Sequence, residues 1–182
     1  MSSYNEKEII ALLQEKDRQK EAFSRIVAQY SEQLYWQIRR MVLFHDDAND
    51  LLQNTFIKAW INIDYFRAEA KLSTWLYRIA YNVFYDYLRS RKDTADLDTR
   101  EVDTHWNTSQ DDVGQQIDIY QALATLKEME RTCITLFYME DQSIEKIAGI
   151  TGCPAGTVKS HLSRAKEKMA TYLKQNGYDG NN

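Results

Sequence analysis

Apolar residues recur at spacings of three and four along most of this chain, and this period is the strongest constraint on its fold. The stretch from Leu72 to Lys92 shows the period most clearly. Its inward stripe consists of Leu72, Trp75, Leu76, Ile79, Ala80, Val83, Phe84, Tyr87 and Leu88. Such spacing is typical of a helix that packs on a core. Because the chain has one proline, six glycines and no alternating apolar run, the sequence predicts an all-α fold.

The outer face of the 72–92 helix carries aromatic, cationic and amide side chains instead of a uniform charged surface. We expect Tyr77, Tyr81 and Tyr85 in one exposed row, with Arg78, Asn82 and Arg89 in a second row beside it. Arg91 and Lys92 follow, so the helix ends basic. Exposed aromatic rings can stack on unpaired bases while the cations contact phosphates, which predicts a surface for single-stranded DNA. The alternative is that the three tyrosines only cover neighbouring helices.

A second candidate DNA-binding element lies at residues 144–163. Ser143 is a suitable helix start, Gly152 allows a tight turn, and Pro154 suits the first turn of a second helix. Val158, Leu162, Ala165 and Met169 form the inner stripe of that helix. Its outer face carries Thr157, Lys159, Ser160, His161, Ser163 and Arg164. This arrangement predicts a helix-turn-helix whose second helix enters a major groove.

Charge is distributed unevenly along the chain, whose net charge is −4. Residues 70–92 carry net +4 and residues 143–182 net +3, whereas residues 93–118 carry net −7. The two positive segments coincide with the two candidate DNA-binding elements. No apolar stretch approaches the length of a membrane span and no signal peptide is recognisable, so we expect a soluble, cytoplasmic protein. Cys133 lies in an apolar run and is expected in the core, and Cys153 in a turn.

The period divides the chain into two predicted domains. Residues 1–92 are expected to form a four-helix domain, with helices near 6–15, 19–44, 46–63 and 72–92. Residues 93–115 show no period and are expected to be an acidic, flexible linker. Trp106 lies within this polar run and is expected to seat in an apolar niche of a partner. The alternative is that Trp106 folds back onto one of the two domains. Residues 116–175 are expected to form the second domain, with helices near 116–126, 128–138, 143–151 and 154–175, before a tail at 176–182.

Three tracts of the chain together resemble a known family. They are DDANDLLQNTFIKAW (46–60), STWLYRIAYNVFYDYLR (73–89) and GTVKSHLSRAKEKM (156–169). In this order and separation they look like an extracytoplasmic-function sigma factor, with a region 2-like and a region 4-like domain and no region 3. The resemblance implies a subunit of bacterial RNA polymerase that binds the core enzyme, recognises and melts promoter DNA, and is held by an anti-sigma factor. It implies no catalytic residue, cofactor or metal.

The resemblance also implies roles for individual residues. Asp50, Leu51, Gln53, Phe56 and Trp60 match the tract that docks on the clamp of the polymerase. Because the helical period places Leu51, Leu52, Phe56 and Trp60 inward, direct docking is better assigned to Asp50, Gln53, Asn54 and Ile57. Trp75, Arg78 and Asn82, with the loop at 66–73, match the segment that captures the −10 element as an unpaired strand. Lys159, Ser160, His161 and Arg164 match the helix that reads the −35 duplex.

Three residues depart from the family pattern. Asn49 and Asn54 stand where acidic residues are common, which predicts altered contacts with the polymerase clamp. His161 stands where arginine is usual and lacks its charged fork, so the −35 preference is the part least transferable by resemblance.

Two other classes of protein are less consistent with the sequence. An ordinary helix-turn-helix regulator would account for residues 144–163 and would bind duplex DNA without polymerase, but it leaves the aromatic row without a role. An enzyme is disfavoured because His45, His105 and His161 lie far apart and no catalytic motif accompanies them. The acidic group Asp46, Asp47 and Asp50 is better explained as a helix start than as a metal site.

Overall fold

Helices are the only regular secondary structure among the residues that the structure describes. A computed structural model describes residues 5–42, 45–93 and 113–178. The elements are α1 (Glu6–Gln14), α2 (Gln19–Val42), α3 (His45–Ile61), α4 (Leu72–Asp93), α5 (Val113–Ala124), α6 (Glu128–Ile134), α7 (Ile144–Thr151) and α8 (Ala155–Gln175). Short 3₁₀ turns lie at Lys16–Arg18 and Ile63–Tyr65, and a π-helical segment at Thr135–Met139 follows α6. The predicted all-α class is confirmed.

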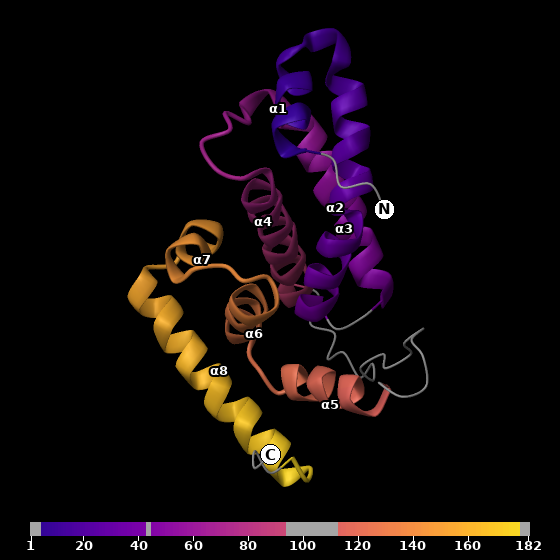
Figure 1. The fold of residues 1–182 in the computed structure, drawn as a ribbon. Helices are drawn as coiled ribbons and strands as arrows, with labels where there is room; N and C mark the ends of the chain where they lie inside the picture. The colour runs from indigo at the N-terminus through magenta and orange to yellow at the C-terminus, as the bar shows by residue number, and fades with distance from the viewer. Residues whose placement is uncertain (1–4, 43–44, 94–112, 179–182) are drawn as a thin grey trace.

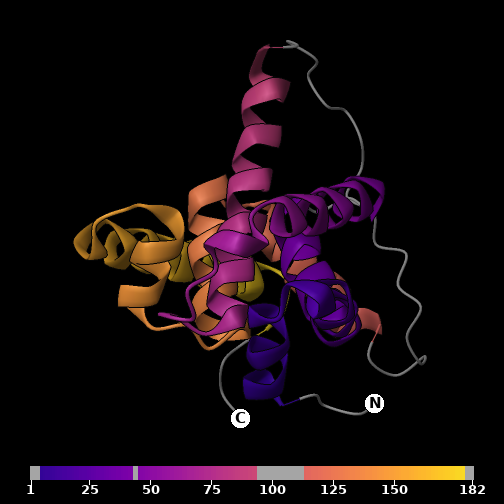
Figure 2. The same ribbon diagram turned by 90° about the horizontal axis from the view of Figure 1, so that it is seen from above.

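The N-terminal half is a bundle of α1–α4, seen in the upper part of Figure 1. Its core consists of side chains at helical spacing, among them Ile9, Ile26, Leu34, Ile38, Met41, Leu51, Leu72, Leu76 and Phe84. The N-terminus of α1 is capped by the Asn5 side chain, which accepts a hydrogen bond from the Lys7 N–H at 3.0 Å. The last turns of α4 extend beyond the other helices (Figure 2). The bundle thus presents one face of α4 and one face of α3 outward.

The C-terminal half contains the expected helix-turn-helix, formed by α7 and α8. The Ser143 hydroxyl caps α7 by accepting a hydrogen bond from the Lys146 N–H at 3.3 Å. Gly152 ends α7 in the left-handed conformation, with φ 71°, and its N–H donates to the Ala148 carbonyl. Pro154 occupies the N-cap of α8, one residue before the first turn that the sequence predicts. The buried stripe of α8 contains Val158, Leu162 and Ala165.

The helix expected at 128–138 is interrupted. It is α-helical only to Ile134, and the next turn is a π-helix that ends at Met139. The Glu140 N–H donates to the Thr135 carbonyl at 3.2 Å, which closes this wide turn. The π-helix therefore delivers Glu140 to the end of the element.

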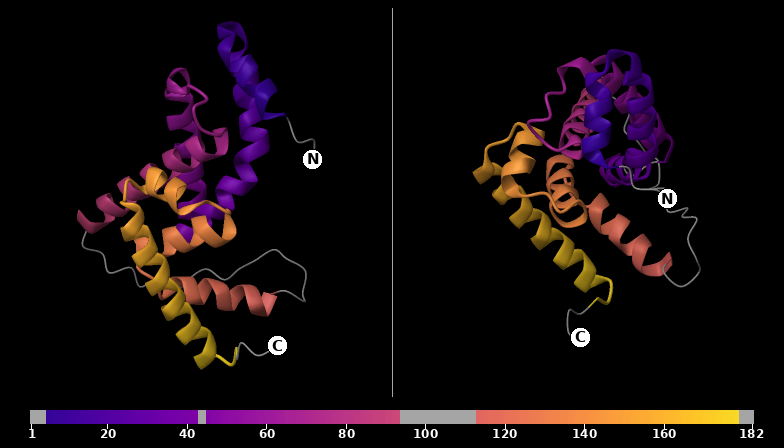
Figure 3. Two further views of the ribbon diagram at one scale, coloured as in Figure 1. Left: turned by 60° about the vertical axis from the view of Figure 1, so that its left-hand side comes forward. Right: turned by 45° about the horizontal axis from the view of Figure 1, so that its top comes forward.

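The two halves are in direct contact. α7 packs against α4, while α6 and the π-helical segment pack against α2. Figure 1 and the right-hand view of Figure 3 show α6 and α7 between α8 and the N-terminal helices. The predicted acidic linker and Trp106 lie outside the described residues, apart from the start of α5, which begins at Val113, a few residues earlier than expected. Within the described residues, no helix is both long and apolar enough to span a membrane.

Candidate nucleic-acid interface

The outer face of α4 differs from the sequence prediction at two of its three tyrosines. Tyr85 is 52% exposed, but Tyr77 is only 1% exposed and Tyr81 only 6%. The expected exposed aromatic row is therefore wrong for Tyr77 and Tyr81. Arg78, Asn82 and Arg89 are exposed as expected, and Trp75 is half-buried. The structure does not describe the side chains of Arg91 and Lys92.

The C-terminal half accounts for the burial of Tyr77. Its hydroxyl donates a hydrogen bond to the Glu140 carboxylate at 2.8 Å and also contacts the Gln33 amide. Burial, together with the Glu140 charge, raises the pKa of the Tyr77 hydroxyl well above its ordinary value of 10. Tyr77 is thus a neutral donor in the contact between the two halves, and its ring is not available to stack on a base.

Tyr81 is buried in the same contact. Burial, together with the neighbouring Cys153, raises the pKa of its hydroxyl to about 12. Its ring stacks against that of the exposed Tyr85, with centroids 6.2 Å apart and an angle of 30° between the planes. A signal for this burial exists in the sequence, because Tyr77 and Tyr81 flank the apolar stripe and leave α4 apolar over much of its circumference.

The exposed side of α4 contributes instead to a cavity shared with α3 and the turn that follows it. The cavity has a volume of about 340 Å³ and is lined by Lys58, Asn62, Tyr65, Trp75, Arg78, Ile79 and Asn82. This volume lies within the range of small-molecule sites. Trp75, Arg78 and Asn82, which the sequence singled out, come together here. The aromatic and hydrogen-bonding groups around the cavity suit a planar base that has left its stack.

Three lining residues of this cavity were missed by sequence reasoning. Lys58 lies near the end of α3, Asn62 directly follows this helix, and Tyr65, which is 75% exposed, belongs to the 3₁₀ turn. The Asn62 amide donates to the Lys58 carbonyl at 2.8 Å and Lys58 Nζ pairs with Asp86 on α4 at 2.8 Å. Tyr65 could have been identified from the sequence, because it is an aromatic residue in an otherwise polar loop.

The outward face of α8 agrees with the sequence prediction at every position but one. Thr157, Lys159, Ser160, Ser163 and Arg164 are exposed. His161 is half-buried, and its Nδ1 is buried with no hydrogen-bond partner among the described residues. The expectation that His161 lies on the outer face is corrected accordingly. The exposed set of hydroxyl and cationic groups can contact phosphates and base edges.

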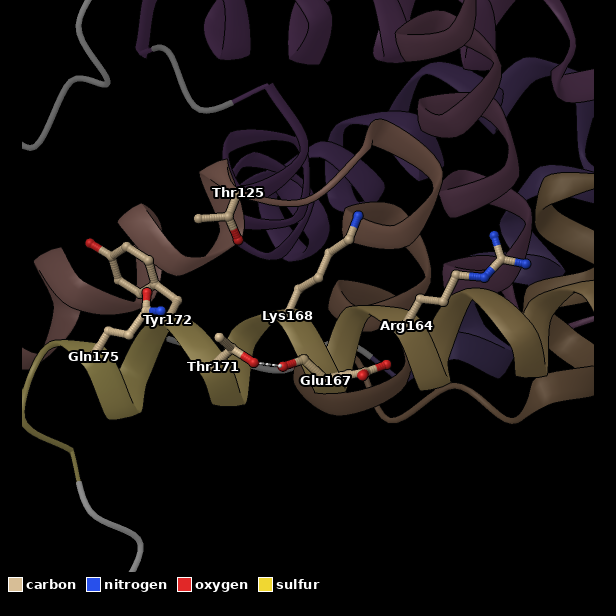
Figure 4. A pocket seen from close by; sticks show the side chains of 7 residues that line it. All are labelled: Thr125, Arg164, Glu167, Lys168, Thr171, Tyr172 and Gln175. Atoms are coloured by element: carbon tan, nitrogen blue, oxygen red, sulfur yellow. Dashed lines mark hydrogen bonds between the residues drawn. The ribbon is translucent and has the colours of Figure 1, made fainter.

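A second cavity, of about 480 Å³, lies along α8 toward the end of α5, and Arg164 of the outward face also lines it (Figure 4). It is lined by Thr125, Arg164, Glu167, Lys168, Thr171, Tyr172 and Gln175. Tyr172 donates a hydrogen bond to the Gln121 side chain of α5 at 2.8 Å. Lys168 Nζ lies 2.6 Å from the Glu130 carboxylate of α6. These contacts fix α8 against α5 and α6.

The exposed face of α3 carries the residues assigned to direct docking. Asp50, Gln53, Asn54 and Ile57 are exposed, and Ile57 is 56% exposed. Leu51 is buried and Phe56 half-buried, as the stripe predicts.

Trp60 departs from the stripe. It is 38% exposed and packs edge-on against Phe23, with ring centroids 5.0 Å apart. Ile61, which was not anticipated, is also exposed, so Ile57, Trp60 and Ile61 form an apolar patch on α3.

Comparison with known proteins agrees with this geometry. Residues 26–94 match the model of sigma-70 region 2, and residues 116–169 match that of sigma-70 region 4. The chain is 34% identical to the ECF RNA polymerase sigma factor SigW of Bacillus subtilis, over 88% of this chain and 94% of that protein. It is also 34% identical to the ECF RNA polymerase sigma-E factor of Haemophilus influenzae, over 82% and 86% of the two chains. This chain belongs to the ECF sigma factors.

Solved structures give the same result. The sigma factor RpoE of Bartonella quintana, in complex with the anti-sigma factor NepR, superimposes with a TM-score of 0.71 at 30% identity, over 84% of this chain and 96% of that one. CnrH, in complex with the cytosolic domain of CnrY, shares the fold at 22% identity with a TM-score of 0.67, over 92% and 95%. The chain is an RNA polymerase sigma factor that acts in promoter-specific initiation, and it is not an enzyme. The regulator alternative is not favoured.

Proposed function

We propose that the cavity between α3 and α4 holds an unpaired base of the −10 element while the DNA strands are separated. The observation that carries this proposal is the convergence of Trp75, Arg78 and Asn82 with Tyr65 around one base-sized space. Asn82 and Arg78 supply hydrogen bonds and charge, and the exposed ring of Tyr65 supplies a stacking surface.

Permanganate footprinting of the open complex tests this role. Tyr65→Ala and Asn82→Ala are expected to reduce the reactivity of −10 thymines severalfold, with core polymerase still bound. Tyr138→Ala is the matched control, because Tyr138 is another exposed tyrosine and lies in the other half of the chain. Unchanged reactivity in both cavity variants would remove the cavity from strand capture.

We propose that the exposed face of α8 reads the −35 duplex. Lys159, Ser160 and Arg164 are offered as base or phosphate contacts, with Thr157 and Ser163 at the edges of the same face. The support is that these polar side chains all lie opposite the buried stripe of α8 in a helix-turn-helix.

We propose that α3 docks on the clamp of core polymerase through Asp50, Gln53, Asn54 and Ile57. The apolar patch of Ile57, Trp60 and Ile61 supports this assignment, because an exposed apolar patch bordered by polar residues marks a protein interaction site. Asp50→Lys and Ile57→Asp are expected to weaken core binding at least tenfold in a pull-down or fluorescence titration, whereas Lys20→Asp on the exposed start of α2 should not.

We propose further that the chain works in the cytoplasm, where core polymerase lies, and that an anti-sigma factor holds it inactive. The support is its likeness to the Bartonella RpoE, whose structure contains the anti-sigma factor NepR. Co-purification of the tagged chain from its native cell, followed by identification of a stoichiometric partner other than polymerase, tests this point.

A further inference from the structure

The segment that joins α3 to α4 is held at its far end by the N-terminal helix α1. The Glu6 carboxylate of α1 accepts a hydrogen bond from the Leu72 N–H at 2.7 Å, in a partly buried position. Leu72 begins α4, and Lys71 takes the N-cap position, because its carbonyl accepts the Trp75 N–H at 3.1 Å. A lysine side chain has only donors and cannot cap a helix. Since the first turn of α4 contains no acidic residue, Glu6 of α1 supplies the negative charge that a helix N-terminus favours.

A second contact holds the near end of the same segment. Gln19 Nε2, at the start of α2, donates to the Asp64 carboxylate in the 3₁₀ turn after α3, at 2.8 Å. The same nitrogen lies 3.4 Å from the Leu13 carbonyl of α1, so one side chain joins α1, α2 and this turn. α1 is itself fixed on the bundle, where its Ile9 is fully buried. Figure 1 shows the segment between α3 and α4 beside α1, at the upper end of the bundle.

Both contacts reach residues that adjoin the walls of the cavity between α3 and α4. Asp64 directly precedes Tyr65, and Leu72 precedes Trp75 by less than one helical turn. The Phe66 ring packs on the Trp75 ring, with centroids 5.1 Å apart, and so connects the start of the segment to the cavity wall. Because the Tyr65 side chain is 75% exposed, its position depends on the backbone beside it more than on packing.

Between the two contacts the chain makes an exposed bend. Residues 67–71 are all exposed, and Ala68 has φ 54°, a left-handed conformation that alanine seldom adopts. Such a conformation persists where the surrounding structure fixes it. Since none of these five side chains is buried, the bend is fixed through its two ends. Loss of either end contact would therefore change the shape of the segment while the core of the bundle stays intact.

The likeness to known sigma factors assigns no role to these two contacts. The residues that match sigma-70 region 2 begin at residue 26, so Glu6 and Gln19 both lie before them. Neither side chain lines the cavity. An effect of either residue on the recognition of DNA would have to pass through the segment that they hold.

We propose that Glu6 and Gln19 are positioning residues that set which base of the −10 element the cavity accepts. They act by fixing the two ends of the segment, and with them the spacing between the rings of Tyr65 and Trp75. The proposal rests on the proposed function, since it assumes that the cavity holds a −10 base. It adds that the sequence preference at this site depends on α1, a helix that does not line the site.

Promoter selection by the holoenzyme tests this role, with a library that is randomised across the −10 element and has a constant −35 element. Glu6→Ala is expected to lower the ratio between the preferred and the next base at one −10 position by about threefold, the scale of one ordinary hydrogen bond. Gln19→Ala should act in the same direction but less, because its contact is exposed. Glu6→Gln keeps an acceptor oxygen and should stay close to the wild type. Glu8→Ala and Gln14→Ala are the matched controls, because both side chains are exposed on α1.

A local cap separates positioning by α1 from simple capping of α4. Lys71→Ser places a hydroxyl acceptor at the N-cap, where serine is a preferred residue. In the Glu6→Ala background it should restore the melting temperature, because α4 is capped again. It should not restore the base preference, because the contact with α1 is still missing. Lys71→Ser in the wild-type background is the reference, since it includes any effect of losing the lysine itself.

The outcomes separate positioning from folding and from the proposed function. Affinity for core polymerase should match the wild type in every variant. A uniform loss of open complexes on all −10 sequences, with unchanged base ratios, would overturn the positioning role. Recovery of the base preference by Lys71→Ser would overturn the part played by α1. If Tyr65→Ala and Asn82→Ala reduce the −10 preference and Glu6→Ala does not, only the positioning role fails. If the two cavity variants also leave the preference unchanged, the proposed function fails with it.

Discussion

Lys168 Nζ of α8 lies 2.6 Å from a carboxylate oxygen of Glu130 on α6, which joins two helices that are separated in sequence by the π-helical segment and α7. The Glu130 side chain is almost fully buried, whereas that of Lys168 is partly exposed. The same carboxylate accepts the Lys127 N–H at the start of α6, at 3.2 Å. One side chain thus caps α6 and fixes the position of α8.

This pair predicts how the stability of the chain depends on pH. Burial alone would raise the pKa of Glu130, but the hydrogen bonds from Lys168 and from the Lys127 N–H, with the charge of Lys168, outweigh it and lower the pKa below 4.5. A carboxyl whose pKa is lowered by folding contributes stability above its ordinary pKa and loses this contribution as the pH falls through the lower, folded-state pKa. Thermal unfolding of the wild type and of Glu130→Gln should therefore differ at pH 7, and the difference should shrink as the pH falls below 4.5. A constant difference across that range would contradict the role of the charge.

The same substitution is expected to lower the free energy of unfolding strongly at Tyr81 and very little at Tyr85. Tyr81→Ala should lower the free energy of unfolding by about 3 kcal/mol, because it leaves a cavity beneath the C-terminal half. Tyr85→Ala should change it by less than about 0.5 kcal/mol, because the ring is half exposed. Urea unfolding followed by circular dichroism compares the two. Equal effects would mean that Tyr81 is not covered in solution.

These tyrosines also show where sequence reasoning reached its limit. The period located every helix within a few residues, because apolar spacing reports burial along one element. The period predicted Tyr77 and Tyr81 to be exposed, because it reports packing within the N-terminal half alone. The residues that bury these two tyrosines belong to the C-terminal half and lie more than 50 positions away in the sequence. Trp60 was misplaced for a related reason, since one aromatic ring can pack against Phe23 and still expose its edge. The π-helix at Thr135–Met139 leaves no periodic signal, so the position of Glu140 could not be predicted.

Gly149 of α7 and Gly152, which follows this helix, form a matched pair for a test of the helix-turn-helix. A Cβ added to Gly149 or to Gly152 meets no atom within 4 Å, so steric clash does not separate the two sites. Gly152 has φ 71°, and Gly152→Ala should destabilise the chain by about 1 kcal/mol. Gly149 lies inside the helix, and Gly149→Ala should stabilise it by about 0.5–1 kcal/mol. Changes of the same sign in thermal unfolding would contradict the observed turn.

Two lysines of α8 are expected to contribute differently to the salt dependence of DNA binding. Lys159→Ala should weaken holoenzyme binding to promoter DNA and reduce the slope of log affinity against log salt by about 1, as expected for one lost phosphate contact. Lys174→Ala is the control, because Lys174 is exposed near the far end of the same helix. Binding measured by fluorescence anisotropy at several salt concentrations separates them. Identical slopes would exclude Lys159 from the DNA contact.

Substitution of Arg164 is expected to reduce the sequence preference at the −35 element. If it contacts a base edge with both nitrogens, Arg164→Ala should cost about 1–3 kcal/mol of discrimination at one −35 position. Selection from a promoter library randomised at the −35 element measures this preference. His161→Ala serves as the comparison, because the half-buried His161 should alter stability more than preference.

The unpaired amide of Gln37 has a consequence for any attempt to engineer this chain. This side chain is fully buried, and neither atom of its amide has a hydrogen-bond partner among the described residues. A leucine at this position would remove the buried amide, so a screen for a higher melting temperature would favour it.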